Sequence, residues 1–317
     1  MMNSKRFFVI LMLLFSGMVV YGNGVKVVDT AQSVAKDTVQ PKVSNWKVNS
    51  VPSLRFSQFY YDNWASDGYT QVAFTMGYIG TYTYTKPNYI WDSRIDLAFG
   101  FLKIDMNGDK IFDDSKYLRK SDDKMDFTST FSLKMKNNWN CNASVNLKSQ
   151  FYDSYKFYAD PEQEPTLIST LFAPAYMITS LGFEYKKSFW NVSLSFITGK
   201  NTFVLDERIN PGDYGVVEGK SYMGWGSYIR FYFKKDIFKN VNLYTRLEVF
   251  WEYQKELLTQ TDVNWETMLE FKVNTWLSAF AGLNVIYDAD YDLKRQLYQR
   301  SGIQINLDWI NHHRKKH

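Results

Sequence analysis

Histidine is the side chain that most often acts as a general base near neutral pH, and this chain has few of them. Its 317 residues include three, His312, His313 and His317, which lie beyond the last candidate strand and away from every long connecting segment. A serine–histidine or aspartate–histidine pair at such a segment would therefore lack its base. Carboxylate-only catalysis stays open in principle, but no distinctive acidic pair indicates it. We predict that the chain is not an enzyme, with no catalytic residues and no cofactor.

An acidic segment partly matches a calcium-binding loop. Such loops place oxygen ligands at positions one, three and five, glycine at six and a carboxylate at twelve. Here Asp105, Asn107 and Asp109 occupy the first three ligand positions, but Lys110 and Lys116 stand at the sixth and twelfth. A second acidic segment with the same weakness carries Asp288, Asp290 and Asp292. We predict solvated, aspartate-rich turns and no metal site.

From about residue 120 onward, apolar and polar side chains alternate with a period of two, which gives a strand one apolar and one polar face. In the clearest run the apolar side carries Met125, Phe127, Ser129, Phe131, Leu133 and Met135. The polar side carries Lys124, Asp126, Thr128, Thr130, Ser132, Lys134 and Lys136. This run is much longer than the five or six residues usual in soluble proteins, and it reaches the roughly ten that a tilted strand needs to cross a bilayer. The pattern predicts a transmembrane strand.

The composition agrees with a barrel of such strands. The chain is 45% hydrophobic and 18% aromatic, yet its mean hydropathy is −0.36. No apolar stretch after the first twenty-odd residues could form a spanning helix. An aromatic-rich soluble sandwich is the alternative, but aromatic rings at both membrane interfaces explain the excess better.

Twelve candidate strands follow one another, and their connections alternate between short and long. Bacterial outer-membrane barrels have short periplasmic turns, long extracellular loops and an even number of strands. We therefore predict an all-β fold, a transmembrane antiparallel β-barrel of about twelve strands within a range of about ten to fourteen. The candidates span residues 54–61, 69–84, 89–103, 124–136, 139–151, 167–186 with a break near Pro174, 190–198, 222–234, 241–252, 263–273, 277–287 and 297–309.

The ends of the chain read differently from its centre. Residues 1–22 resemble a secretory signal peptide, with Lys5 and Arg6 before a short apolar core. We predict a flexible periplasmic tail over 23–50, the barrel over 51–309 and a basic periplasmic tail over 310–317. Cys141, the single cysteine, falls on the apolar side of its strand and is expected to face lipid.

Charged residues on the polar faces are the remaining candidates for function, because a basic residue facing lipid would cost about 2–4 kcal/mol. Twelve strands leave an interior that is either bridged by ion pairs or open as a narrow pore. Within the set, the four glutamates 248, 252, 266 and 270 would favour cations if they line an open passage. The candidate lumen-lining residues are Arg94, Asp96, Lys134, Lys148, Glu184, Arg230, Arg246, Glu248, Glu252, Glu266, Glu270 and Lys272.

Several local blocks occur in a consistent order over residues 46–309. They are Trp46-Lys47, Ser57-Gln58, Asn63-Trp64-Ala65, Gly68, Trp91-Asp92, Leu97, Phe99-Gly100, Arg119-Lys120-Ser121-Asp122-Asp123, Ile168-Ser169, Ala173-Pro174-Ala175-Tyr176, Leu181-Gly182, Gly199-Lys200, Thr202, Val204, Asn264-Trp265-Glu266, Ile286-Tyr287-Asp288, Asp290 and Gly302. They resemble a domain-of-unknown-function family of outer-membrane β-barrels from bacteroidete-type Gram-negative bacteria. Asp67, Ser93 and Phe196 depart from the family pattern, which affects local loop geometry. The resemblance implies location and architecture but no activity.

Two functions follow from these observations. The first is a narrow, porin-like channel or uptake barrel for small solutes in the bacterial outer membrane, indicated by the charged interior. The alternative is a non-transporting structural or accessory subunit of a larger envelope complex, indicated by the mixed charges and the lack of a substrate motif. The partners implied are outer-membrane lipid, a small solute and envelope proteins. A net charge of +4 indicates no nucleic-acid partner.

Overall fold

The computed structural model describes residues 44–59, 70–105, 119–158, 163–255, 261–288 and 295–306. The expected signal peptide, the basic tail with its histidines and most of the predicted periplasmic tail lie outside these residues. The calcium-like segment beyond Asp105, the acidic residues Asp290 and Asp292, and the end of the last expected strand also lie outside them. Within the described residues, no helix is long and apolar enough to cross a membrane.

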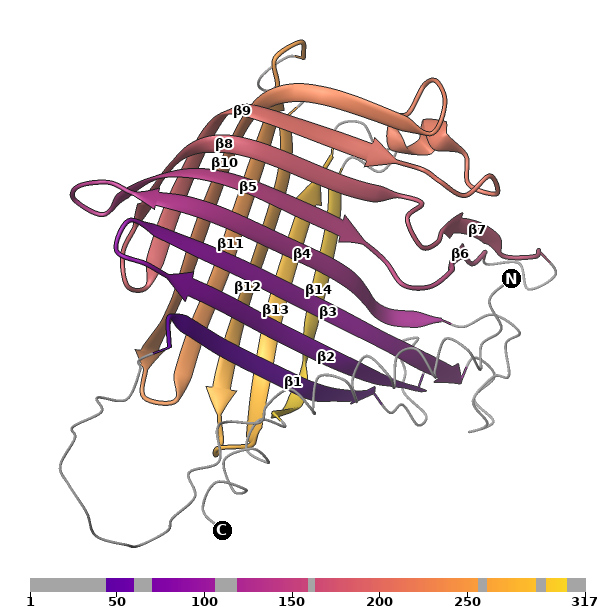
Figure 1. The fold of residues 1–317 in the computed structure, drawn as a ribbon. Helices are drawn as coiled ribbons and strands as arrows, with labels where there is room; N and C mark the ends of the chain where they lie inside the picture. The colour runs from indigo at the N-terminus through magenta and orange to yellow at the C-terminus, as the bar shows by residue number, and fades with distance from the viewer. Residues whose placement is uncertain are drawn as a thin grey trace, which may run out of the picture. The chain divides into compact units, whose positions relative to one another are not determined.

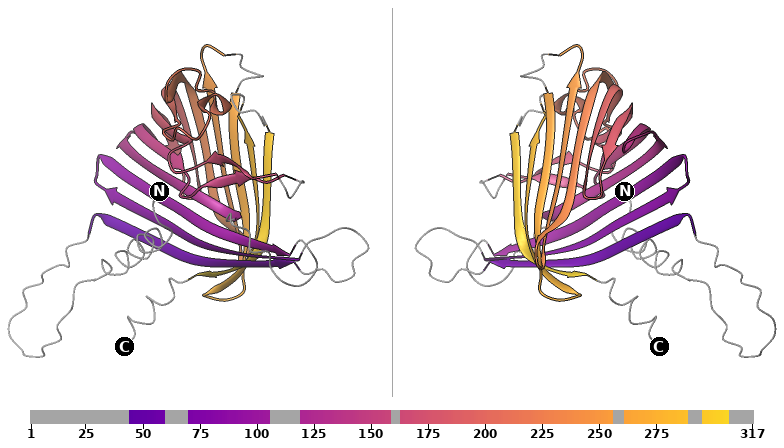
Figure 2. Two further views of the ribbon diagram at one scale, coloured as in Figure 1. Left: turned by 90° about the vertical axis from the view of Figure 1, so that its right-hand side faces the viewer. Right: turned by 90° about the vertical axis from the view of Figure 1, so that its left-hand side faces the viewer.

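Twelve antiparallel strands close into a barrel, in the order β1-β14-β13-β12-β11-β10-β9-β8-β5-β4-β3-β2. β6 (Ser154–Lys156) and β7 (Thr166–Ser169) form a separate small hairpin. Figures 1 and 2 show β1–β5 and β11–β14 as facing walls. The barrel strands are β1 (Trp46–Phe59), β2 (Thr70–Thr85), β3 (Tyr89–Asp105), β4 (Lys120–Lys134), β5 (Trp139–Ser149), β8 (Ala175–Lys186), β9 (Trp190–Phe203), β10 (Ser221–Phe238), β11 (Val241–Glu252), β12 (Thr261–Lys272), β13 (Leu277–Tyr287) and β14 (Arg295–Asn306). The predicted fold class is confirmed.

The barrel closes where the first strand meets the last. β1 pairs with β14 in antiparallel register from Ser53 opposite Asn306 to Phe56 opposite Ile303. The pairing covers four residues of each strand, and over that length it satisfies backbone hydrogen bonds that lipid cannot satisfy.

Burial in this barrel is reversed relative to a soluble protein. On β4 the apolar residues Phe131 and Leu133 are 42% and 50% exposed, whereas Asp126 and Ser132 are 2% and 3% exposed. The outer surface is therefore apolar and the interior polar, which is the arrangement of a barrel surrounded by lipid.

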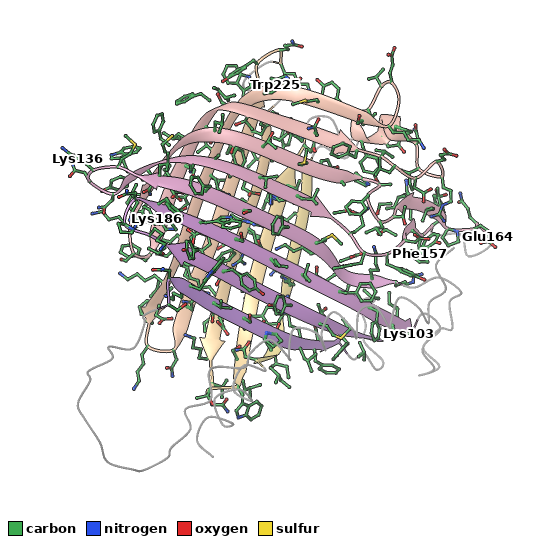
Figure 3. All side chains as sticks on the ribbon, viewed as in Figure 1. Lys103, Lys136, Phe157, Glu164, Lys186 and Trp225 are labelled. Atoms are coloured by element: carbon green, nitrogen blue, oxygen red, sulfur yellow. The ribbon has the colours of Figure 1, made fainter. Side chains whose placement is uncertain are left out.

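The two ends of the barrel differ in their connections. One end, called the turn end, carries the turns at residues 86–88, 135–138, 187–189, 239–240 and 273–276. The opposite end, called the loop end, carries the longer connections. At the turn end Asn137 and Asn138 have φ values of 57° and 66°, as their predicted hairpin turn requires. Figure 3 shows Lys136 at the turn end and Glu164 at the opposite end.

Exposed aromatic side chains gather near both ends. Trp46, Trp91 and Trp139 are 47%, 46% and 42% exposed near the turn end. Trp225 and Trp265 are 56% and 42% exposed on strands nearer the loop end. Two such belts mark the two interfaces of a membrane.

The structure differs from the expected strands in several places; β9, for example, runs to Phe203, whereas the expected strand ends at residue 198. β1 begins at Trp46, so residues 46–50 belong to the barrel and not to the tail predicted over 23–50. The segment 167–186, expected to be one interrupted strand, divides into β7 and β8, because the chain between them turns through Phe172, which has a φ of 55°.

Candidate functional site

A network of ion pairs crosses the lumen, and Glu266 on β12 lies at its centre. Its carboxylate is 3.4 Å from Lys124 Nζ, 3.1 Å from Arg246 Nη2 and 3.3 Å from Arg300 Nη2. Each cation also binds an aspartate of β3 or β4, the wall opposite Glu266: Lys124 binds Asp96 and Arg246 binds Asp126, while Arg300 binds Asp122. The set that we call the bridging network is Asp96, Asp122, Lys124, Asp126, Arg246, Glu266 and Arg300.

The bridging network joins opposite walls of the barrel. β4, which carries Lys124, and β12, which carries Glu266, lie six places apart in the closed order of twelve strands. β4 and β11 lie five places apart, and Arg246 Nη1 on β11 is 2.9 Å from Asp126 Oδ2 on β4. These side chains therefore meet inside the barrel and restrict passage through it.

The bridging network is buried as well as charged. Asp126 is 2% exposed and Arg246 is 7% exposed. Removing charges from water is costly unless partners and hydrogen bonds replace it. Asp126 has both, because Asn146 Nδ2 donates to its other oxygen at 2.7 Å. The planar guanidinium of Arg246 bonds two carboxylates at once, which a lysine could not do in the same geometry.

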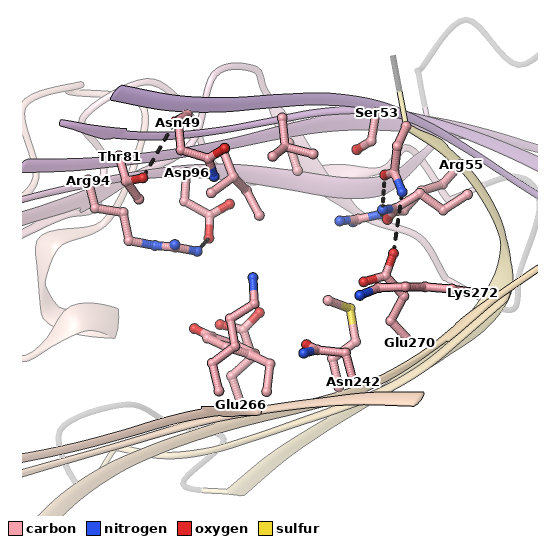
Figure 4. Close-up of a pocket in the computed structure, with 18 of the residues that line it drawn as sticks. Asn49, Ser53, Arg55, Thr81, Arg94, Asp96, Asn242, Glu266, Glu270 and Lys272 are labelled. Carbon is pink, nitrogen blue, oxygen red and sulfur yellow. Dashed lines mark hydrogen bonds and ion pairs between the residues drawn. The ribbon is translucent and has the colours of Figure 1, made fainter. Parts of the chain in front are cut away.

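An inner cavity of about 770 Å³ lies between the bridging network and the turn end. Its wall includes Lys124 and Glu266 of the network and reaches Asn274 and Thr275 in the turn after β12. In Figure 4, Arg94 and Asp96 project from one wall, while Glu266, Glu270 and Lys272 project from the facing wall. The cavity is a vestibule whose lining residues are mainly polar and charged.

A smaller outer pocket of about 380 Å³ lies on the loop side. The barrel contributes Phe250, Ile178 and Val263 to its wall, and the connections contribute Ile168 and Tyr214. This pocket is more apolar than the inner cavity.

The connections beside the outer pocket fold into a small cap. We call residues 154–156, 166–173 and 204–216 the outer cap. Val204, Ile209 and Val216 are 1%, 3% and 2% exposed in its own apolar cluster. Tyr214 ends the short η1 helix (Pro211–Tyr214), and its hydroxyl donates to the Ile168 carbonyl at 2.6 Å. The cap is thus held by a local core and is not a loose loop.

One carboxylate of the outer cap has a strongly perturbed acidity. Asp206 accepts bonds from the Arg208 side chain at 3.0 and 2.8 Å and from its backbone N–H at 2.9 Å. Those hydrogen bonds lower the pKa of Asp206 to about 2. The pair therefore stays ionised near neutral pH and in mild acid.

The sequence-predicted residues do not all come together. Arg94, Asp96, Glu266, Glu270 and Lys272 line the inner cavity. Arg246, with Asp96 and Glu266, belongs to the bridging network.

Others lie elsewhere. Lys148 pairs with Glu248, which also accepts from Tyr228 Oη at 2.8 Å. Glu184 is buried and Arg230 is partly buried, with no hydrogen bond or ion pair to another described residue. Lys134 is exposed at the turn end, where its ammonium donates to the Lys86 carbonyl at 2.6 Å.

The four glutamates do not form a free acidic ring. Glu248 binds Lys148, Glu252 binds Lys255, and Glu266 binds three cations. Glu270 accepts from Ser278 Oγ at 2.9 Å. Because each carboxylate already has a partner, the argument for a cation-selective ring is lost.

Sequence reasoning omitted several residues that build the lumen. Lys124 and Asp126 lie on the polar side of the alternating segment 124–136 but are not among the predicted lumen-lining residues. Arg300 has the same parity as the polar residues of the last strand, so alternation could have found it. Tyr244 and Lys234 also line the inner cavity, and their even numbering on β11 and β10 was the available signal.

A family model for a protein of unknown function, DUF3078, matches residues 56–155, about a third of the chain. The family is uncharacterised and assigns no activity. No curated protein matches this sequence.

Solved structures that resemble the chain are outer-membrane barrels. The COG4313 outer membrane channel from Pseudomonas putida F1 is 10% identical with a TM-score of 0.39, covering 86% of this chain and 98% of that one. An active-site mutant of outer membrane phospholipase A from Escherichia coli is 11% identical with a TM-score of 0.36, covering 86% and 94%. The translocator domain of autotransporter NalP from Neisseria meningitidis is 8% identical with a TM-score of 0.31, covering 95% and 97%. Similarities this low carry no argument about function.

One prediction is corrected by these structures. The prediction that the chain is not an enzyme is wrong. Phospholipase A, an enzyme, is among the barrels that this chain resembles. The resemblance assigns no activity to this chain, but it removes the exclusion.

The location follows from the barrel itself. A closed barrel with an apolar outer surface, two aromatic belts and a polar interior is built for a bilayer. This chain is a bacterial outer-membrane β-barrel. In bacterial outer-membrane barrels the short turns face the periplasm and the long loops face outward, so we expect the same orientation here.

Proposed function

We propose that this barrel is a narrow channel or uptake barrel for small solutes, closed at rest by the bridging network. The observation that carries the proposal is the pair of cavities on opposite sides of that network, about 770 Å³ inside and about 380 Å³ outside. Both have room for a small solute. A structural barrel gains nothing from keeping two such cavities unfilled.

The chemistry of the bridging network suits a gate. Its cations share carboxylates, so a solute carrying a charge can replace one partner without leaving the other unpaired. Lys124, for example, binds both Asp96 and Glu266 at 3.0 and 3.4 Å. Exchange of partners then replaces outright loss of an ion pair, which keeps the barrier to opening low.

Conductance in planar bilayers tests the proposal. Lys124→Ala combined with Glu266→Ala removes the Lys124–Glu266 contact, one of several between opposite walls, and leaves Arg246 and Arg300 paired with their aspartates across the lumen. The double variant should conduct at least about threefold more than wild type, because the narrowest part of the passage widens. The matched control is Glu207→Ala with Lys220→Ala, which removes an exposed ion pair in the connection between β9 and β10 and should leave conductance unchanged.

The accessory-barrel alternative has one observation in its favour, which is that the bridging network neutralises most of the lumen charge at mid-depth. If neither wild type nor the double variant conducts, and the purified barrel retains a stable envelope partner, the channel proposal is rejected. A source among bacteroidete-type bacteria remains part of the proposal and rests on the local sequence blocks alone.

A further inference from the structure

The wall of the inner cavity carries an excess of positive charge. Its lining includes six basic and three acidic side chains. The acidic ones are each engaged, as shown above for Glu266 and Glu270, and Asp96 is shared between Arg94 and Lys124 at 3.1 and 3.0 Å. The charged lining residues are Arg55, Arg94, Lys124, Lys234, Lys272, Arg300, Asp96, Glu266 and Glu270. A solute that enters from the periplasm therefore meets a basic vestibule.

Two buried donors at this wall have no hydrogen-bond partner among the described residues. Tyr244 is 7% exposed, and its hydroxyl makes no hydrogen bond with a described residue. Arg94 uses Nη2 for Asp96, while its Nε has no partner among the described residues. Buried polar groups are nearly always hydrogen-bonded, so two exceptions at one cavity need an explanation.

A third cation lies beside them. Lys234 on β10 is directly opposite Tyr244 on β11, and its ammonium forms no ion pair or hydrogen bond with a described residue. Lys234 and Arg94 repel each other electrostatically, and Tyr244 lies within electrostatic reach of Arg94. β3 and β11 lie six places apart in the barrel order, so Arg94 lies on the wall opposite Lys234 and Tyr244, and all three line the same cavity.

We propose that the inner cavity binds a small oxyanion between Arg94, Lys234 and Tyr244. A phosphate or carboxylate accepts hydrogen bonds from a guanidinium, an ammonium and a phenol, and its charge relieves the repulsion between Arg94 and Lys234. Arg94 Nε and Tyr244 Oη are covered in this structure, so binding requires both side chains to turn toward the cavity. The site names the solute class of the proposed channel, but binding itself does not require conduction.

Calorimetric titration of the purified full-length barrel in detergent tests the site. Inorganic phosphate and succinate are the two probes, and tetramethylammonium is the cation control. At least one anion should bind with one-site stoichiometry, and the tighter of the two identifies a phosphate or a carboxylate solute. Lys234→Gln and Tyr244→Phe should each weaken binding about tenfold or more, because each removes a donor to a charged group.

The matched control is Lys235→Gln. Lys235 is the next residue along β10, and its ammonium lies 4.6 Å from the Phe189 ring on the outer face. This variant loses the same charge one residue away and should bind like wild type. The inference is overturned if neither anion binds the wild-type barrel, if tetramethylammonium binds as well, or if Lys235→Gln weakens binding as much as Lys234→Gln.

Ion selectivity separates this site from the channel proposal. In a salt gradient a conducting wild-type barrel should prefer anions, and Lys234→Glu should shift its reversal potential toward cations. If the barrel binds phosphate or succinate but never conducts, the anion site is supported and the channel proposal is rejected. If it conducts without binding either anion, the channel proposal is supported and the anion site is rejected.

Discussion

The inner cavity and the outer pocket occupy one lumen but offer a solute different environments. The inner cavity is about twice the volume, lined by charge and open toward short turns. The outer pocket is bordered by Phe250, Ile178 and the outer cap. Short turns cannot fold inward, whereas the connections of the loop end are long enough to build a core of their own. The comparison shows that the barrel strands form the passage. Which side chains point into the lumen, and how long the loops are, determine the kind of solute that fits each half.

Arg246→Ala should have the largest effect, because Arg246 separates the two compartments. It leaves Asp126 and Glu266 with one cation fewer in a buried site, which should destabilise the barrel by about 3–5 kcal/mol. Urea unfolding of the barrel in lipid vesicles measures the change. Adding Asp126→Ala should recover part of the lost stability, because it removes the carboxylate that Arg246→Ala leaves buried without its cation. A loss below about 1 kcal/mol would mean that the network is water-filled.

Leu247→Arg tests whether both compartments lie within the bilayer. Leu247 follows Arg246 on β11 and therefore points to the opposite, lipid-facing side. An arginine at this position should lower the free energy of unfolding by about 2–4 kcal/mol. The same unfolding measurement reports it. Leu205→Arg, at a residue 52% exposed in the outer cap, serves as the control and should change stability little. Equal effects at the two positions would contradict the assignment of the outer face to lipid.

Tyr214→Phe should loosen the outer cap alone. The variant loses the bond to the Ile168 carbonyl, worth about 1 kcal/mol, so amide exchange in residues 166–170 should quicken about fivefold. Peptides from the turn at 273–276 should exchange as in wild type. Uniform acceleration at both ends would show that the cap and the vestibule are not independent.

The smallest effect concerns the pH response of the outer cap. The Asp206–Arg208 contribution is complete above the ordinary carboxyl pKa of 3.8 and is lost as the pH falls toward about 2. Carbon NMR of the Asp206 carboxyl should give the low midpoint, and Arg208→Ala should raise it toward 3.8. Lys220→Ala, which removes a weaker and more distant charge, should move it far less. An unchanged midpoint in Arg208→Ala would assign the shift to another cause.

Alternation predicted the strands well because lipid and lumen impose it residue by residue. It could also place Arg246 and Glu266 on the polar face. It could not predict that Lys124 would meet Glu266, 142 residues away, because that contact depends on strand tilt and barrel closure. Nor could it predict the outer cap, since Val204 and Val216 lie in a connection rich in glycine, aspartate and proline. Lys134 shows the remaining weakness, because parity says nothing about depth in the membrane.

The position of β4 in the chain has a consequence for assembly. Asp122, Lys124 and Asp126 all belong to this early strand, while their partners Arg246, Glu266 and Arg300 are supplied by β11, β12 and β14. A half-built sheet can pair Lys124 with Asp96 and Asp122 with Arg55, but the bridging network is complete only when the last-made third of the chain is added. The stabilising ion pairs with Arg246, Glu266 and Arg300 form only when the last strands are added. The incomplete sheet therefore has an electrostatic reason to wait for its final strand before it separates from the machinery that inserts it.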